Sequence, residues 1–101
     1  MNFSVLISLY HKEKPYFLKE CLESLKNQTL PATEIVMVFD GAITTELEEV
    51  VTQFITILPI KIIRIPQNVG LGNALNEGLK HCSYDWVFRM DTDDICVPER
   101  F

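Results

Sequence analysis

Apolar residues along the chain follow two patterns, short continuous runs and stripes at helical spacing. Continuous apolar runs of about six residues are typical of strands buried on both faces of a parallel sheet. Residues 3–9 and 35–39 are nearly continuous runs of this kind, and the shorter, interrupted apolar segments 60–65 and 85–90 predict two further strands. Between them, apolar residues recur every three or four positions, as they do on one face of a helix, over residues 15–25, 45–58 and 71–82.

The alternation of these segments predicts the fold class. Strands and helices joined in turn by short loops favour right-handed crossovers, and therefore a Rossmann-like, doubly wound α/β fold with a mostly parallel sheet. We expect about four strands and three helices in one domain over residues 1–101. Ligands bind beyond the carboxyl ends of such strands. The candidate functional segments are therefore residues 10–14, 40–42, 67–72 and 91–94.

A few single residues carry structural expectations of their own. Thr45 and Glu48 have the spacing of a capping box, which predicts that the second helix begins there. Gly78 predicts a close approach of the third helix to the sheet. Three further side chains are expected in the core because they fall on apolar stripes or within a strand: Cys21, Cys82 and Trp86.

Charge narrows the range of partners. Lys and Arg number 9 and Asp and Glu number 14, so the net charge is -5, which disfavours electrostatic binding to nucleic acid or to an anionic membrane. A phosphate-bearing ligand would then need a divalent cation to neutralise it. The three cysteines show no CxxC spacing, and no apolar run approaches the ~20 residues of a membrane span. We expect a cytoplasmic protein in a reducing compartment.

The acidic segment after the fourth strand is the sharpest chemical signal. Asp91, Asp93 and Asp94 place three carboxylates within four residues at a strand end where ligands bind. An acidic, solvated turn is the plain structural interpretation of such a cluster. A hard divalent cation, Mg²⁺ or Mn²⁺, would turn the mutual repulsion into attraction and is the interpretation that the other loops favour.

The segments in order resemble the nucleotide-binding half of a family 2 glycosyltransferase of the GT-A fold. The resemblance covers essentially the whole chain, and its strength lies in the order and spacing of its elements. These are Ser4–Tyr10, Leu22–Gln28, Glu34–Gly41, Asn68–Gly72, Asn76–Leu79, Arg89–Asp94 and Pro98–Phe101. The Arg89–Met90–Asp91 form is similar to a subgroup that builds bacterial surface polysaccharides.

The resemblance implies a UDP-sugar as donor and a residue-by-residue assignment of its pocket. Ser8 and Tyr10 match positions that line the nucleotide pocket, with the tyrosine beside the base. Asp40 matches the aspartate that accepts a hydrogen bond from uracil, and Asp91 matches the first acid of the DxD motif, near the ribose. The family usually has an aspartate where this chain has Phe39, and many members have an arginine in place of Leu75.

The resemblance also implies the metal site and the reaction. Asp93, with Asp91, would bind the Mn²⁺ or Mg²⁺ that bridges the diphosphate, and Asp94 is a third candidate ligand. Transfer to a polysaccharide or lipid-linked acceptor, with inversion, needs a general base that in the family lies far downstream of the metal loop. We therefore expect a chain cut shortly after this loop, inactive alone, self-associating through the cut surface, and at the inner face of the membrane when full length.

Two other classes of protein share this layout. A signalling receiver module also binds a divalent cation at strand ends, but it needs acids after its first strand, where this chain has Tyr10–Lys12. A sugar-nucleotide nucleotidyltransferase would carry a glycine-rich, basic phosphate loop there, and residues 10–14 contain no glycine. A non-catalytic binding domain is the third alternative.

Overall fold

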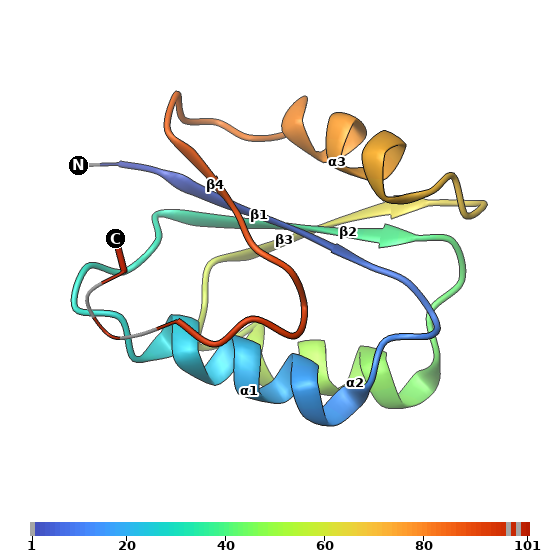
Figure 1. The fold of residues 1–101 in the computed structure, drawn as a ribbon, viewed down its shortest axis with the longest axis horizontal. Helices are drawn as coiled ribbons and strands as arrows, with labels where there is room; N and C mark the ends of the chain where they lie inside the picture. The colour runs from blue at the N-terminus through green and yellow to red at the C-terminus, as the bar shows by residue number, and fades with distance from the viewer. Residues whose placement is uncertain (1, 97, 99) are drawn as a thin grey trace.

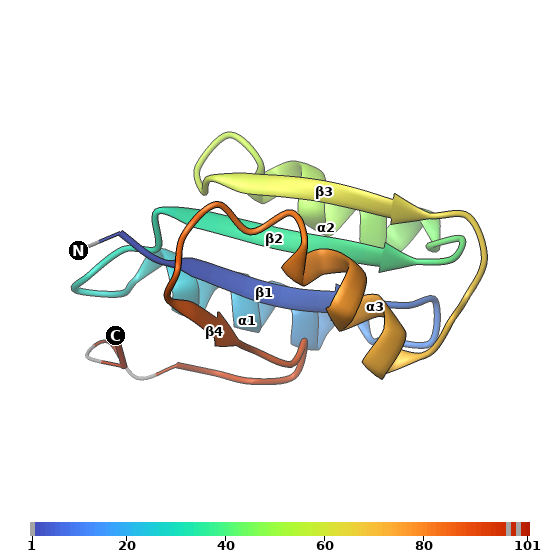
Figure 2. The ribbon, with the colours of Figure 1, turned by 90° about the horizontal axis from the view of Figure 1, so that it is seen from above.

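Four parallel strands form one sheet in the computed structural model, which describes residues 2–96, 98, 100 and 101. The strands lie in the order β3-β2-β1-β4, so that β1 and β2 are central (Figure 2). The strands are β1 (Ser4–Leu9), β2 (Glu34–Asp40), β3 (Ile60–Ile65) and β4 (Val87–Arg89), and the helices are α1 (Pro15–Lys26), α2 (Thr45–Phe54) and α3 (Leu71–Leu79). The predicted α/β class, with four strands and three helices, is confirmed.

The helices cover both faces of the sheet. Figure 1 shows α1 and α2 side by side below the sheet and α3 above it. The lower layer encloses the larger apolar core, to which β1 contributes Val5, Ile7 and Leu9. The upper layer encloses a smaller core that includes Leu6 and Ala74. Because alternate residues of a strand point to opposite faces, β1 contributes apolar side chains to both cores.

Gly78 sets the distance between α3 and the sheet. A Cβ atom at this position would lie 2.5 Å from Val38 Cγ2 and 2.6 Å from Leu6 Cδ1, closer than side chains pack. The absence of a side chain therefore lets the helix backbone rest directly on β1 and β2. This confirms the sequence prediction for Gly78.

Some local predictions need correction. The N-cap of α2 is Thr44, whose side chain accepts a hydrogen bond from Leu47 N at 3.3 Å, so the cap lies one residue before the Thr45 predicted from the capping-box spacing. The helix ends at Phe54, and the expected stripe beyond it belongs to a turn. Cys21 is fully buried as predicted, whereas Cys82 is only partly buried.

The prediction that Trp86 lies in the core is wrong, because its side chain is 62% exposed. Trp86 precedes the short strand β4, and its carbonyl accepts a hydrogen bond from Ser4 N at 2.8 Å. The residue therefore extends the backbone pairing with β1, while its side chain lies at the edge of the sheet with little protein over it. Among the described residues, the structure contains no helix with the length and apolarity needed to cross a membrane.

Candidate functional site

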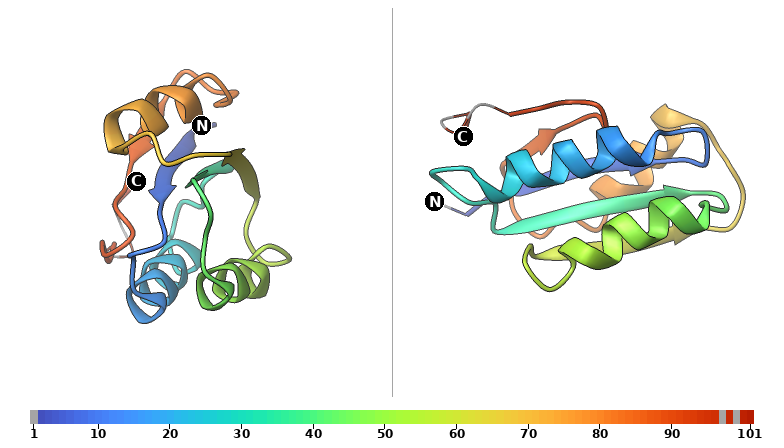
Figure 3. Two further views of the ribbon diagram at one scale, coloured as in Figure 1. Left: turned by 90° about the vertical axis from the view of Figure 1, so that its right-hand side faces the viewer. Right: turned by 90° about the horizontal axis from the view of Figure 1, so that it is seen from below.

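The loops that follow β1, β2 and β3 gather at one end of the molecule. This end is on the right of Figure 1 and faces the viewer in the left view of Figure 3. Parallel strands point the same way, so residues far apart in sequence come together where the strands finish. The candidate residues predicted from the sequence lie at the ends of β1 and β2, directly after β1, and in the loop after β4.

Asp40 is a buried carboxylate at the end of the molecule where these loops meet. It is the last residue of β2 and is 2% exposed. Its Oδ1 accepts a hydrogen bond from Val69 N at 2.8 Å, and its Oδ2 accepts one from Gly70 N at 3.1 Å. The carboxylate therefore holds the backbone of the loop that leads into α3. We call this pair of bonds the Asp40 clamp.

Glycines allow the loops after β2 and β3 to meet closely. Gly41 has φ +84°, and a Cβ atom there would lie 2.9 Å from Asn68 N. Asn68 Nδ2 in turn donates to the Asp40 carbonyl at 3.3 Å. Gly70, the N-cap of α3, has φ +90°. Both positive φ values favour glycine, so the two glycines and the Asp40 clamp together shape this corner of the protein.

A pocket of about 280 Å³ opens beside the Asp40 clamp. Of the four residues predicted to bind the nucleotide, Ser8, Tyr10 and Asp40 line this pocket, and Asp91 is not among the lining residues. The pocket therefore joins the ends of β1 and β2 to the loop after β3. Four further residues line it that the sequence analysis had not selected as ligands: Glu13, Asn68, Gly70 and Leu71. Each lies in or beside a loop that the strand-end argument had marked.

The acidic loop after β4 brings its three carboxylates together. Asp91, Asp93 and Asp94 can each offer an oxygen atom within 4.8 Å of the others. Asp94 also has a structural role, because its Oδ2 accepts from Asp91 N at 2.9 Å while Asp94 N donates to the Asp91 carbonyl at 3.0 Å. Arg89 Nη2 lies 3.5 Å from Asp91 Oδ1. In the described part of the chain, the exposed Asp93 carboxylate has no hydrogen bond or ion pair.

These carboxylates fit a hard divalent cation. Two oxygens bound to one Mg²⁺ lie at most about 4.2 Å apart, so small rotations of exposed side chains would bring them onto a single ion. Asp93 is the most available ligand because its oxygens are not engaged elsewhere. Asp91 forms an ion pair with Arg89, and one Asp94 oxygen already accepts a hydrogen bond from the backbone N–H of Asp91.

A buried thiol supports the acidic loop from below. Cys21 Sγ of α1 lies 3.6 Å from the Asp91 carbonyl oxygen, to which it donates a hydrogen bond. Burial, with Cys96 and two loop carboxylates nearby, raises the pKa of the Cys21 thiol to about 12. The thiol therefore keeps its proton at neutral pH and remains a donor. Cys96 Sγ lies 3.5 Å from Met90 Sδ, so a buried contact between two sulfur atoms joins the residues on either side of the acidic loop.

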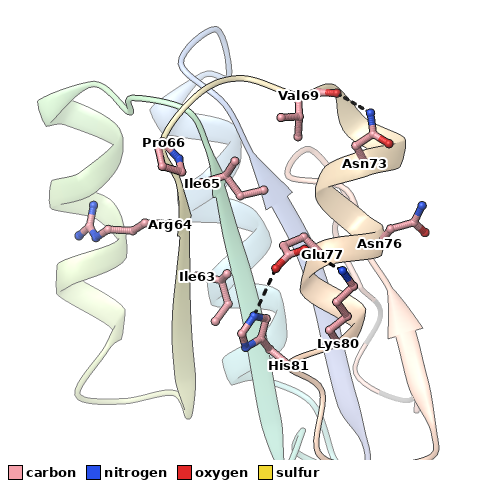
Figure 4. Close-up of a pocket in the computed structure, with 10 residues that line it drawn as sticks. All are labelled: Ile63, Arg64, Ile65, Pro66, Val69, Asn73, Asn76, Glu77, Lys80 and His81. Atoms are coloured by element: carbon pink, nitrogen blue, oxygen red, sulfur yellow. Dashed lines mark hydrogen bonds and ion pairs between the residues drawn. The ribbon is translucent and has the colours of Figure 1, made fainter.

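A larger, shallow pocket of about 600 Å³ lies between α3 and β3. Figure 4 shows Glu77 in its wall, directed toward Lys80 and His81. The Glu77 carboxylate lies 3.2 Å from Lys80 Nζ and 3.7 Å from His81 Nε2. None of the sequence-predicted site residues lines this pocket, so the candidate chemistry belongs to the smaller one.

A family model and several relatives match the chain. The model described as Glycosyl transferase family 2 matches residues 4–101. An uncharacterized glycosyltransferase of Haemophilus influenzae is 69% identical over 101 residues, which are 100% of this chain and 38% of that protein. The amylovoran biosynthesis glycosyltransferase AmsE of Erwinia amylovora is 58% identical over 99 residues, 98% of this chain and 37% of that protein.

An Escherichia coli relative is named after a nucleotide-sugar donor. It is a UDP-Gal:alpha-D-GlcNAc-diphosphoundecaprenol beta-1,3-galactosyltransferase, 42% identical over 100 residues, 99% of this chain and 36% of that protein. The chain thus spans little more than a third of the length of these curated relatives. Among solved structures, Staphylococcus aureus TarS in complex with UDP superposes with a TM-score of 0.85 and 31% identity, covering 98% of this chain and 29% of that one.

Proposed function

The chain belongs to glycosyltransferase family 2, and on that premise we propose that it binds the UDP-sugar donor of a sugar transfer, with a divalent cation held at its acidic loop. Its relatives are bacterial glycosyltransferases of polysaccharide biosynthesis, and its structural neighbours have the GT-A fold. The family match favours this function over a signalling receiver or a nucleotidyltransferase. The acceptor, a saccharide or a lipid-linked sugar, belongs to the same proposal.

The observation that carries the proposal is the pocket beside the Asp40 clamp. It brings together Ser8, Tyr10 and Asp40, three residues that the family resemblance had assigned to the nucleotide. The acidic loop follows β4, which pairs directly with β1. A nucleotide pocket and a cation site along one sheet edge are the arrangement that a nucleoside diphosphate donor needs, since its base is uncharged and its diphosphate is anionic.

UDP is the donor nucleotide that the site chemistry and the relatives favour. The E. coli relative is named for UDP-Gal, and the TarS structure contains UDP. A carboxylate has about four acceptor positions, and the Asp40 clamp uses one on each oxygen. Asp40 therefore keeps the capacity to accept the N3 hydrogen of uracil, which cytosine lacks.

The acidic loop supplies the charge that the diphosphate requires. Asp93, with Asp91, would hold the cation, and Asp94 is the third candidate. When bound, the cation stabilises negative charge on the leaving diphosphate as a Lewis acid. In an inverting transfer, a general base removes the proton of the acceptor hydroxyl. We propose that this base lies outside residues 1–101, so that the chain alone binds donor without completing transfer.

The test is titration calorimetry with UDP and with uridine, each with and without Mn²⁺. We expect Asp93→Ala to abolish the Mn²⁺-dependent gain in UDP affinity and to leave uridine binding unchanged, because uridine has no phosphates. Asp85→Ala is the matched control, since Asp85 is an exposed acid before the other end of β4. The proposal fails if the parent chain does not bind UDP, or if Asp93→Ala keeps the full effect of Mn²⁺.

A further inference from the structure

Glu13 is a half-buried acid in the nucleotide pocket that none of the assignments above explains. We propose that Glu13 determines specificity for a ribonucleotide donor by accepting hydrogen bonds from the ribose hydroxyls. The inference rests on the proposed function, because it requires that the pocket holds a nucleotide. It adds a second residue to ribose recognition, for which the family resemblance had pointed to Asp91.

The loop after β1 directs this residue to the pocket. Glu13 N donates to the Tyr10 carbonyl at 3.1 Å, which closes a tight turn directly after the strand. The turn places Glu13 on the pocket wall with Ser8, Tyr10 and Asp40. Within the described part of the chain, the Glu13 carboxylate makes no hydrogen bond or ion pair. Its acceptor positions are therefore available to a ligand.

The strand order places the ribose at the end of β1. Asp40, which would bind the base, ends β2, and the acidic loop, which would bind the cation, follows β4. Strand β1 lies between these two strands. Neighbouring strands are about 4.8 Å apart, so the outer two are separated by about 10 Å. A nucleoside diphosphate that reaches from Asp40 to Asp93 must therefore cross the end of β1 with its middle part, the ribose.

The negative charge of the Glu13 carboxylate limits which part of the nucleotide it can contact. Glu13 repels phosphate oxygens, so it suits only a part of the nucleotide that donates hydrogen bonds. The base donor is N3–H, which faces Asp40 in the proposed mode, and the remaining donors on the nucleoside are the 2′ and 3′ hydroxyls. Two adjacent hydroxyls suit the two oxygens of one carboxylate. A 2′-deoxynucleotide would leave part of this acceptor unpaired, which disfavours it.

The experiment compares UDP, 2′-deoxy-UDP and 3′-deoxy-UDP by calorimetry in the presence of Mn²⁺. The parent chain should bind UDP roughly ten- to a hundredfold more tightly than either deoxy analogue, as expected for hydrogen bonds to a charged acceptor. Glu13→Ala should lose UDP affinity by a similar factor, and the differences among the three ligands should shrink to what Asp91 alone can provide. Glu13→Gln, which keeps one acceptor oxygen, should retain part of the discrimination.

The sign of the change separates this role from that of a simple surface acid. If Glu13 only adds negative charge near the diphosphate, Glu13→Ala would tighten UDP binding. Glu49→Ala is the control for net charge, because Glu49 is exposed on α2, outside the nucleotide pocket. Unchanged or tighter UDP binding by Glu13→Ala, or discrimination that survives undiminished in this variant, overturns the inference and leaves the proposed function standing. A parent chain that does not bind UDP overturns both.

Discussion

Replacing Asp40 by Asn should destabilise the protein, because the Asp40 clamp needs two acceptor oxygens. The amide of Asn has one oxygen, and its NH₂ group would face the second backbone N–H, donor against donor. The two bonds now measure 2.8 and 3.1 Å, and the side chain that makes them is 2% exposed. A hydrogen bond to a charged group contributes about 1.5–3 kcal/mol, so the loss of one sets the scale of the effect.

For a domain of this size, 1 kcal/mol shifts the melting temperature by roughly 4–8 °C. Asp40→Asn should therefore lower it by roughly 6–24 °C in thermal unfolding followed by circular dichroism. Hydrogen exchange adds a local readout, because the amides of Val69 and Gly70 should lose protection. Asp85→Asn makes the same chemical change at an exposed position and should stay within about 0.5 kcal/mol of the parent. An unchanged melting temperature with both amides still protected would refute the clamp.

The same variant also tests base recognition. A loosened loop should weaken UDP and CDP binding by the same factor, so the ratio of the two affinities isolates the contact with the base. Asp40→Ala should weaken UDP roughly ten- to a hundredfold and narrow its advantage over CDP. Mn²⁺ dependence should persist in both variants because Asp93 is untouched. A UDP to CDP ratio that stays at the parent value would show that Asp40 holds the loop without contacting the base.

Three further predictions concern the scaffold. Gly78→Ala should lower the midpoint of a urea unfolding curve, because the new Cβ overlaps Val38 and Leu6 and such overpacking costs about 1–3 kcal/mol, more than the gain in helix propensity; a higher midpoint would contradict the packing. Burial disfavours the charged form of Glu34, but hydrogen bonds from Ser83 and Ser4 outweigh it and hold its pKa below the usual range. The ionised Glu34 therefore stabilises the fold fully above the ordinary pKa of glutamate, and this stabilisation is lost as the pH falls through the lowered pKa. The difference in unfolding free energy between the parent and Glu34→Gln should shrink on acidification, and a difference that stays constant would exclude this role. Self-association should appear in light scattering as an average mass that rises with protein concentration. This rise should be smaller in Trp86→Ser, since Trp86 and Ile95, which precede and follow β4 in the sequence, are 62% and 64% exposed. A parent chain that stays monomeric at high concentration would contradict the prediction.

The sequence predicted the elements well because their patterns are local. Strand β3 was predicted at its observed bounds, and α1 and α2 begin at residues 15 and 45, where the predicted helical segments begin. Trp86 was misplaced because an apolar residue in a strand is buried only if something covers that edge, which local pattern does not encode. The Thr44 cap was missed because two adjacent threonines offer the same chemistry.

The same distinction between local and long-range information holds for the candidate site. Asp40 was marked because it ends a strand, and the strand-end rule needs only the order of elements. Its bonds to Val69 and Gly70 depend on a loop 29 and 30 residues away in sequence, and no short motif reports such a contact. Glu13 has no signal of its own in the sequence, because its place on the pocket wall depends on the turn that its backbone N–H forms with the Tyr10 carbonyl.

The Asp40 clamp constrains how such a protein could change its donor. One carboxylate holds the entrance of α3 and, in the proposed mode, also reads the base. A substitution here that admits a different base therefore weakens the scaffold in the same step. The exposed neighbours Asn68 and Leu71 line the same pocket without carrying the clamp through their side chains. Selection for a new nucleotide should therefore act first at these two positions, with Asp40 retained, and libraries for donor engineering should be designed accordingly.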